Sequence, residues 1–440
     1  MARIVLTTWG SLGDLHPYLA IGTEMKRRGH EVAVATLAVW ESSVRDAGLG
    51  FHPIRPDVPR DDPQSKELVR RLLDARGGPD YLIEKVLAPV LRETYDDCLA
   101  AVRADGGADL LITHQIPITG PLVAEATGVQ WVSGVLLPMA FLSDYDPATP
   151  PQAPWIQKIA ALHPAIAGLM HKGARRMTRK WAAPTDRLRK SLGLAPGGHP
   201  IFEGQHSPTL VLALFSRVLT EKQPDFPPQT VITGFPFYDG ADLRPPDPQL
   251  LRFLDAGEPP IVFTLGSSAV WIADDFYSTA IDAVGALGRR AVLLAGDQAS
   301  DLRSSGLPDT IAAFDYAPHS LVMPRASVVV HQGGVGTTGQ ALRSGRPQLI
   351  VPFGQDQPDN ARRSVRLGVA RTIARSAFRS ERVAAELEHL LKNSSYAARA
   401  GVIAAIVRSE EGSRTACDEI ERRIHAKLSP WKASKQRSAT

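Results

Sequence analysis

The stretch HQGGVGTTGQALRSGRPQLIVPFGQDQPDNARR, residues 331–363, decides the fold. It follows ASVVVH, residues 326–331, whose short β-branched run predicts a buried parallel strand. The glycines after this strand allow a tight turn, and the next helix extends to about Ser344, with Gly345 as its stop. A strand, a glycine-rich turn and a helix in this order predict one unit of an α/β domain.

This turn also predicts an anion-binding site. A helix N-terminus presents N–H groups without partners and a partial positive charge, and glycines let a ligand approach the backbone closely. Thr337 and Thr338 are good helix-capping residues, and His331 can donate a hydrogen bond to the same anion. The residues expected at this site are His331, Gly334, Val335, Gly336 and Thr337.

A second strand, QLIVPF at residues 348–353, leads to Asp356 and Gln357. A carboxylate beside an amide suits the vicinal hydroxyls of a sugar, because the pair both accepts and donates hydrogen bonds. The sequence therefore predicts a phosphate site and a polyol site side by side.

The amino terminus predicts a second unit of the same kind. Residues 2–9 form a strand, residues 10–13 a turn, a helix begins at Asp14, and residues 31–37 form the next parallel strand. The turn then lies at the carboxyl edge of the sheet, where open α/β sheets bind ligands. An NAD site is disfavoured, because the turn reads G-S-L-G instead of G-x-G-x-x-G and residues 35–37 lack an acidic ribose ligand.

Composition fits a globular enzyme of two α/β domains. The chain has 440 residues, 44% hydrophobic and 22% charged. We expect neither a signal peptide nor a membrane span, since no apolar run approaches the roughly 18–20 residues that cross a bilayer. Two distant cysteines, Cys98 and Cys417, predict neither a metal site nor disulfides and suit a reducing cytoplasm. A net charge of +4 without an aromatic-interleaved basic motif gives no indication of nucleic-acid binding.

In order and spacing, residues 331–363 resemble the donor motif of family 1 glycosyltransferases of the GT-B fold. The resemblance is strongest to the bacterial branch with sterol glucosyltransferases, antibiotic glycosyltransferases and rhamnosyltransferases. It implies two Rossmann-like α/β domains that face each other across a cleft. It also implies an inverting, metal-independent transfer of a hexose from a nucleoside diphosphate sugar to a hydroxyl of a small-molecule or lipid acceptor. UDP-glucose is the first donor expected, from the Asp356–Gln357 pair, and a dTDP-deoxysugar is the second.

The resemblance also assigns the domains and further donor residues. We expect an acceptor domain over residues 1–236, a linker at 236–248, a donor domain over 250–400, and C-terminal helices over 401–440 that return to the first domain and end in a frayed tail. At YAPH, residues 316–319, the resemblance implies that the aromatic residue stacks on the nucleotide base. This sequence has Tyr where the family more often has Trp, and His where the family has Gln. The serines after strand 261–266 would touch the diphosphate, although capping a helix is the simpler role for them. These further donor residues are Tyr316, Ala317, His319, Ser267 and Ser268.

GSLGDLHP, residues 10–17, resembles the family signature whose acidic or histidine side chain faces the acceptor hydroxyl, and Asp14 falls on that position. A catalytic base needs hydrogen-bond reach to the hydroxyl, and a partner must help it hold the proton. His16 and His114, which follows strand 108–113, are the available partners. Capping of the helix start is the alternative role of Asp14, and a structural role is the alternative for each histidine.

Residues 147–190 interrupt the α/β pattern and, by resemblance, cover the acceptor site. Apolar residues recur there at helical spacing, although Pro164 must kink or divide the helix. A core-facing stripe is one interpretation. The basic run that follows offers another, contact with an anionic membrane surface. The stripe comprises Trp155, Ile159, Leu162, Ile166 and Leu169, and the basic run begins with Lys172, Arg175, Arg176, Arg179 and Lys180.

Asp144-Tyr145-Asp146 spells a D-x-D motif, by which another glycosyltransferase fold holds a metal. We do not expect a metal here, because His331 and a helix N-terminus already serve the diphosphate. Two alternative functions share the fold. A sugar-nucleotide 2-epimerase would need no acceptor cavity, and a non-catalytic GT-B partner subunit would be expected to have lost its donor residues.

Overall fold

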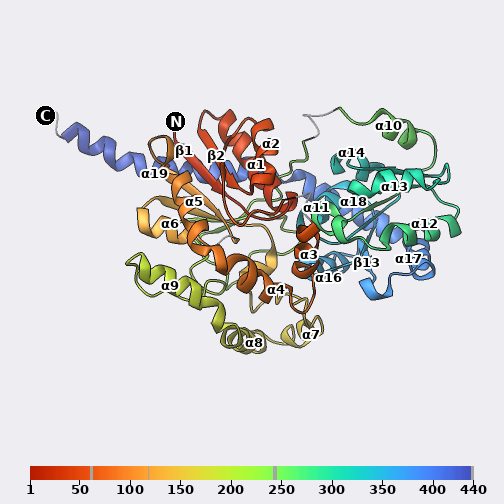
Figure 1. The fold of residues 1–440 in the computed structure, drawn as a ribbon, viewed down its shortest axis with the longest axis horizontal. Helices are drawn as coiled ribbons and strands as arrows, with labels where there is room; N and C mark the ends of the chain where they lie inside the picture. Colours follow the sequence, from red (N-terminus) through yellow and green to blue (C-terminus); the bar gives the residue numbers. More distant parts are fainter. Residues whose placement is uncertain (60–62, 117, 241–244, 438–440) are drawn as a thin grey trace.

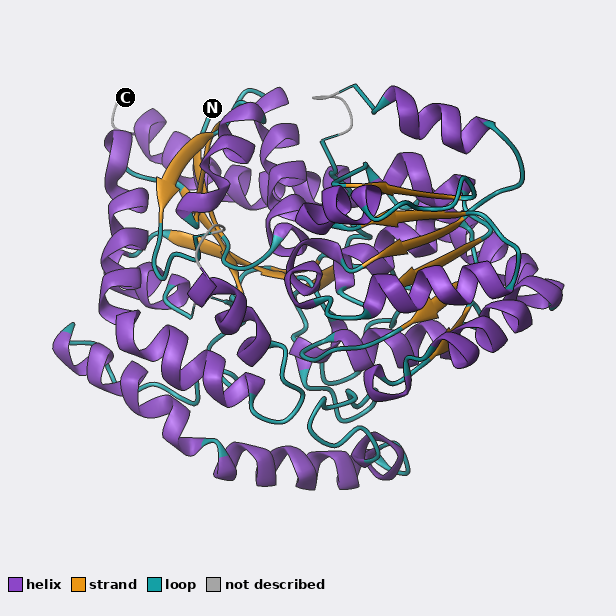
Figure 2. Ribbon diagram, turned by 45° about the vertical axis from the view of Figure 1, so that its right-hand side comes forward, coloured by secondary structure: helices purple, strands orange, loops and turns teal. Residues whose placement is uncertain are grey.

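The computed structural model describes residues 1–59, 63–116, 118–240 and 245–437. Two parallel β-sheets, one in each half of the chain, form the centres of two α/β units (Figure 1). Helices cover both faces of each sheet (Figure 2), so the strands are buried on both sides. Every residue of Arg3–Thr7, Leu110–His114 and Val328–His331 is buried, as the apolar runs of the sequence predict.

Within the described residues, the first sheet has seven strands in the order β3-β2-β1-β4-β5-β6-β7. These strands are β1 Arg3–Thr7, β2 Glu31–Thr36, β3 Gly50–Pro53, β4 Leu110–His114, β5 Gln130–Val135, β6 Val211–Ala213 and β7 Thr230–Ile232. The helices of this half are α1 Leu12–Arg27, α2 Glu41–Asp46, α3 Pro63–Leu72, α4 Gly78–Tyr81, α5 Leu91–Arg103, α6 Gly120–Thr127, α7 Ile156–Ala160, α8 Pro164–Met177 and α9 Ala183–Ser191.

The second sheet has six described strands in the order β10-β9-β8-β11-β12-β13. These strands are β8 Ile261–Thr264, β9 Ala291–Leu294, β10 Ile311–Phe314, β11 Val328–His331, β12 Gln348–Ile350 and β13 Ala370–Thr372. The helices that follow α9 are α10 Pro248–Asp255, α11 Gly266–Ala269, α12 Phe276–Ala286, α13 Ala299–Ser304, α14 His319–Val322, α15 Val335–Ser344, α16 Gln357–Arg366, α17 Ser380–Lys392, α18 Ser394–Ser409 and α19 Gly412–Arg437.

Both sheets confirm the expected pair of Rossmann-like folds. In each sheet the first strand of the unit lies between its second and fourth strands, so the strand order reverses beside it. Ligands of such sheets bind at this switch point, beyond the carboxyl ends of the two central strands. The switch points lie after β1 and β4 in the first half and after β8 and β11 in the second.

The last helix leaves the second half and packs on the first (Figure 1). Arg28, at the end of α1, contacts α19 through Asp418 at 2.6 Å and Glu421 at 2.8 Å. The helix extends to Arg437, and residues 438–440 of the tail that we expected to be frayed lie outside the described residues. Residues 241–244 of the expected linker lie outside them as well. Within the described part of the chain, no helix is both long enough and apolar enough to cross a membrane.

Candidate active site

The two switch points face each other directly. A Cβ atom placed on Gly336, in the first turn of α15, would lie 3.3 Å from the Cα atom of Gly13 in the first turn of α1. The backbone N–H of Leu12 donates to Ser267 Oγ at 3.1 Å. The N-termini of α1 and α15, which come from opposite halves of the chain, therefore meet at one place.

Asp14 is held at this place by the start of α1. The helix begins at Leu12, earlier than predicted, with Ser11 as the N-cap and Asp14 as the third helical residue of a capping box. Asp14 Oδ2 accepts from the N–H of Ser11 at 2.8 Å and from its hydroxyl at 3.0 Å. Gly10 allows this close approach, because a Cβ there would lie only 2.4 Å from Asp14 Oδ2. One oxygen of Asp14 is thus used structurally, and Oδ1 lies toward His114.

His114 ends β4 and lies with its Nε2 atom 3.5 Å from Asp14 Oδ1. Its side chain is 1% exposed, whereas that of Asp14 is 28% exposed. Burial lowers the pKa of His114, and the Asp14 carboxylate opposes that shift. Nδ1 contacts both the carbonyl and the N–H of Ile116. In the tautomer that accepts the Ile116 N–H, Nε2 carries the proton and lies 3.5 Å from Asp14 Oδ1, without a hydrogen-bond partner among the described residues.

His16 lies in a different environment from Asp14 and His114. Its ring packs edge-on against Tyr238 at 5.4 Å. Burial lowers its pKa to about 4, with Asp239 raising it and His319 lowering it further. Of the two histidines expected beside Asp14, the structure brings His114 into contact and directs His16 toward the segment that joins the two halves.

In the second half, His331 is completely buried at the end of β11. Its Nδ1 accepts from the N–H of Gly333 at 3.1 Å, so the proton is on Nε2, which lies 3.1 Å from Gln348 Oε1. Burial lowers its pKa to about 4, and the Gln348 hydrogen bond opposes that shift. The direct donation to a diphosphate that we expected would require one of these hydrogen bonds to break. In the structure, His331 instead fixes the glycine turn.

One N–H group at the N-terminus of α15, that of Val335, is bonded to a carboxylate. The N-cap residue of α15 is Gly334, which has no side chain to cap the helix. The expectation that a threonine caps this helix is therefore wrong. Asp356 Oδ2 instead accepts from the N–H of Val335 at 3.1 Å. Burial raises the pKa of Asp356 to about 7, and the facing charge of Asp14 raises it further.

Gln357 and Asn360 complete the first turn of α16. Gln357 Oε1 accepts from Phe353 N at 2.7 Å, which leaves its amide nitrogen as the group available to a sugar. Asn360, which the sequence analysis missed, donates to Asp356 Oδ2 at 2.6 Å and to the carbonyl of Gly333 at 2.9 Å. Its spacing of four residues from Asp356 on a helix is the signal that could have revealed it.

Three buried oxygens around this turn have no hydrogen-bond partner within the described chain. They are Gln332 Oε1, Thr338 Oγ1 and Asn360 Oδ1. Buried polar atoms are rarely left without a hydrogen bond, so we expect each of these three oxygens to bond to a ligand or to an ordered water. Their position beside the start of α15 supports a polar ligand there.

The remaining residues expected at the donor site lie around the same end of the second sheet. Tyr316 is 53% exposed, and its hydroxyl donates to the carbonyl of Asp239 at 2.7 Å. Ala317 is buried, and burial lowers the pKa of His319 to about 4. Ser267 and Ser268 lie inside α11 and do not cap it, because its N-cap is Leu265.

The two carboxylates of the D-x-D motif diverge. Asp144 Oδ1 lies 2.6 Å from His171 Nδ1 in α8. Asp146 pairs with Arg363 in α16. The structure therefore uses them as two separate ion pairs with protein partners.

The apolar stripe of residues 155–169 is not part of the core. Pro164 divides it, as expected, into α7 and α8. The core-facing interpretation is wrong, because most of the stripe is open to solvent along the lower edge of the first half (Figure 1). The exposed fractions are Trp155 62%, Ile159 39%, Leu162 73% and Leu169 72%.

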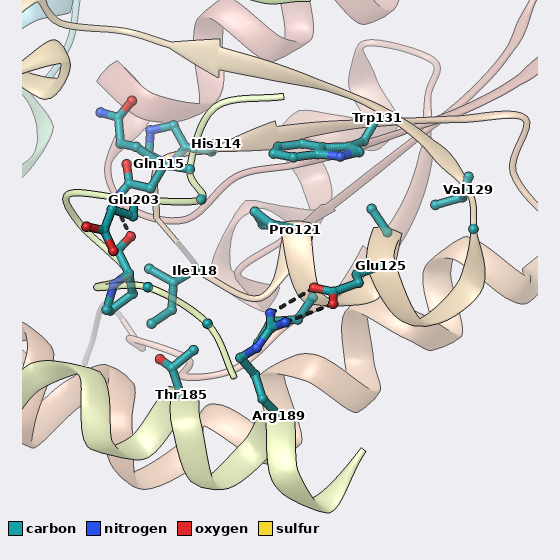
Figure 3. Close-up of a pocket in the computed structure, with 18 residues that line it drawn as sticks. His114, Gln115, Ile118, Pro121, Glu125, Val129, Trp131, Thr185, Arg189 and Glu203 are labelled. Atoms are coloured by element: carbon teal, nitrogen blue, oxygen red, sulfur yellow. Dashed lines mark hydrogen bonds and ion pairs between the residues drawn. The ribbon is translucent and has the colours of Figure 1, made fainter. Parts of the chain in front are cut away.

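A cavity of about 510 Å³ lies beside His114 (Figure 3). His114 and Gln115 stand at one end, and Trp131 and Pro121 lie along its side. Across the cavity, Arg189 of α9 and Glu125 of α6 form a bidentate ion pair with both N–O distances at 2.8 Å. The cavity combines apolar walls with a few polar groups, which is typical of small-molecule sites.

Comparison with known proteins agrees with this arrangement. Residues 278–426 match the family model of the erythromycin biosynthesis protein CIII-like C-terminal domain, and residues 4–91 match the glycosyltransferase family 28 N-terminal domain. The chain is 32% identical over 428 residues to O-mycaminosyltylonolide 6-deoxyallosyltransferase of Streptomyces fradiae, covering 95% of this chain and 97% of that protein.

Two further proteins are similar over nearly the whole chain. Sterol 3-beta-glucosyltransferase of Leptosphaeria maculans is 28% identical over 452 residues, which cover 97% of this chain but only 30% of that longer protein. The solved structure of spinosyn rhamnosyltransferase SpnG with thymidine diphosphate superposes with a TM-score of 0.65 at 18% identity, covering 96% of this chain and all of that one. The chain therefore belongs to the GT-B glycosyltransferases, the enzyme family that includes the antibiotic glycosyltransferases and the sterol glucosyltransferases.

Proposed function

We propose that this glycosyltransferase moves a hexose, with inversion, from a nucleoside diphosphate sugar to a hydroxyl of a small lipophilic acceptor. Residues 1–236 would bind the acceptor and residues 250–400 the donor. One observation carries the proposal: Asp14 and the N-terminus of α15 come from opposite halves and meet where Gly13 faces Gly336. An acceptor hydroxyl that attacks on the face opposite a diphosphate leaving group needs a base on one side and an anion site on the other.

In this proposal Asp14 Oδ1 takes the acceptor proton as the hydroxyl oxygen attacks the anomeric carbon. His114, 3.5 Å away, orients that oxygen and stabilises its charge. The N–H groups at the start of α15 stabilise the departing diphosphate, with the glycine turn held in shape by His331 and Asn360. Asp356 and the amide of Gln357 orient the sugar.

The relatives favour a 6-deoxyhexose carried on thymidine diphosphate, which was the second donor expected from the sequence. The relative matched over almost its full length transfers a 6-deoxyallosyl group, and the SpnG structure holds thymidine diphosphate. UDP-glucose is the second candidate, supported by the sterol glucosyltransferases, in which the match covers about one third of the protein or less.

We propose that the acceptor occupies the cavity beside His114 (Figure 3). Its volume of about 510 Å³ fits a drug-sized apolar molecule. The α9 residues on its wall belong to the variable region that was expected to cover the acceptor. Replacing Leu122 with Trp should fill the cavity and raise the KM for the acceptor, while the Kd of the donor nucleotide stays unchanged.

The exposed apolar residues of α7 and α8 lie beside basic ones, and we propose that this surface contacts anionic membranes or lipophilic aglycones near them. Lys172 and Arg176 are exposed there. Co-sedimentation at low salt with phosphatidylserine vesicles should retain the enzyme, and Arg176→Glu should release it. No binding by the unmodified protein would refute the membrane contact.

The decisive experiment pairs binding with product analysis. Thermal shift should pick the donor, because a ligand that binds the folded state raises the Tm with concentration. The enzyme is then incubated with that donor, with and without a library of polycyclic hydroxyl compounds. A glycosylated product that needs an acceptor supports the proposal, whereas a new sugar nucleotide formed without acceptor would identify an epimerase.

A further inference from the structure

The loop that carries the D-x-D motif is fixed to the first half of the chain. Ser143 donates its hydroxyl proton to Asp225 Oδ1 at 2.7 Å, and the N–H of Asp144 donates to Asp225 Oδ2 at 2.6 Å. Asp144 pairs in turn with His171 of α8. The side-chain contacts of residues 143–144 are therefore with residues of the first half, and these residues fix the position of the neighbouring Asp146.

Asp146 crosses to the second half, where three arginines of α16 surround its carboxylate. Arg363 pairs with it, Arg366 Nη1 lies at 3.1 Å and Arg362 Nη2 at 3.7 Å. The Asp146 side chain is 11% exposed and that of Arg363 is 1% exposed. Burial is the largest single influence and raises the pKa of Asp146, but the charge and hydrogen bond of Arg363 together with Thr220 and Arg366 outweigh it and lower the pKa to about 2.

Further contacts from the first half hold the same helix. Thr149 donates its N–H to Asp359 Oδ1 at 2.9 Å, and Asp359 Oδ2 accepts from Arg363 Nε at 2.7 Å. The carbonyl of Leu219 accepts from Arg363 at 3.1 Å and from Arg366 at 2.7 Å. Residues of the first half thus hold the last two turns of α16 through hydrogen bonds and ion pairs.

The other end of α16 carries the donor residues proposed above. Asp356 precedes the helix, and Gln357 and Asn360 form its first turn. A helix rises about 1.5 Å per residue, so Arg363 lies only about 10 Å along the axis from Asp356. Because a helix of this length moves as a rigid unit, the contact that fixes its last turns also fixes the carboxylate and the amides at its start.

We propose that Asp146 is a positioning residue for the donor: it holds α16 so that Asp356, Gln357 and Asn360 line the start of α15. The proposal rests on the donor site proposed above. Asp144, two residues away, has the same charge but a partner in α8, so it serves as a matched control. Breaking a buried ion pair leaves an unpaired charge, which makes Asp146 sensitive to neutralisation.

The test compares Asp146→Asn, Asp144→Asn and Asp96→Asn, the last of which breaks an exposed pair with Arg92. In Asp146→Asn we expect the KM for the sugar nucleotide and its calorimetric Kd to rise by about tenfold or more, with kcat at saturating donor within about threefold. The two controls should keep the donor Kd of the unmodified enzyme. Arg366→Gln, at a half-exposed position, is the milder variant should Asp146→Asn fail to fold.

A second readout needs no donor. Small-angle scattering of the ligand-free protein should show a larger radius of gyration for Asp146→Asn than for Asp144→Asn, because one of the contacts between the halves is lost. An unchanged donor Kd and an unchanged radius in a folded Asp146→Asn protein would overturn the proposal, and so would a loss confined to kcat. If no sugar nucleotide binds the unmodified enzyme, the proposed function fails, and scattering alone then decides the role of Asp146.

Discussion

Replacing Asp14 with Asn tests the proposed base with little disturbance of the fold. The amide oxygen can still accept from the N–H and hydroxyl of Ser11, which hold Asp14 Oδ2 at 2.8 and 3.0 Å. What the helix start loses is one negative charge, which is worth about 0.3–1 kcal/mol of stability. The free energy of unfolding should therefore fall by no more than about 1 kcal/mol.

The effect on turnover should be much larger. General-base catalysis supplies about 10²–10⁴ in rate, which corresponds to about 2.7–5.4 kcal/mol of barrier. We expect kcat to fall by about 10²–10⁴ in Asp14→Asn.

The assay is steady-state product formation at saturating donor, with calorimetry of the donor nucleotide on the same protein. Donor binding should be retained, because Asp14 lies across from the anion site and its charge opposes an anion. His16→Ala is the control, since His16 packs on Tyr238 and not on Asp14. Near-normal turnover in folded Asp14→Asn, together with a large loss in His16→Ala, would refute the reasoning and make His16 the base.

Three further predictions concern the donor site and the α7–α8 surface. The pKa of Asp356 is raised to about 7. The stability that its protonated form contributes is therefore fully present below the ordinary pKa of an aspartate and is lost as the pH rises through about 7. Donor affinity measured by calorimetry should fall over the same pH interval. In the Asp356→Asn variant, donor affinity should depend less on pH. His331→Ala should weaken free nucleoside diphosphate and sugar nucleotide alike, since it releases the Gly333 turn, and a loss limited to the sugar nucleotide would contradict that role. Leu162→Ala should leave the Tm nearly unchanged, because the side chain is 73% exposed, whereas a core residue would lose about 2–5 kcal/mol.

Metal independence is the remaining prediction that the sequence makes. Turnover should survive EDTA, because the proposal assigns the diphosphate charge to backbone N–H groups of α15. Activity lost on chelation and restored by Mg²⁺ would show that a metal shares this task.

The sequence predicted the fold well, because several strands are apolar runs followed by a turn that contains glycine, as in residues 2–13 and 326–336. It also placed Asp14, His114, Asp356 and Gln357 at carboxyl edges of strands, where the sheet topology brings them together. The sequence favoured His114 over His16 only by resemblance, since which side of α1 faces β4 depends on packing that no local pattern shows. Similarly, the ion pairs of Asp144 and Asp146 join residues up to 220 positions apart, and no local pattern reveals them.

The return of α19 to α1 has a consequence for engineering. The first half is completed by a segment that follows the second half in the chain, through contacts such as Arg28 with Asp418. A chimeric enzyme that exchanges only residues before the linker would therefore pair a new first half with an α19 helix from the other parent. Recombination with two crossover points, one in the linker and one just before Gly412, keeps α1 and α19 from the same parent. It also allows the second half to be exchanged as an internal segment.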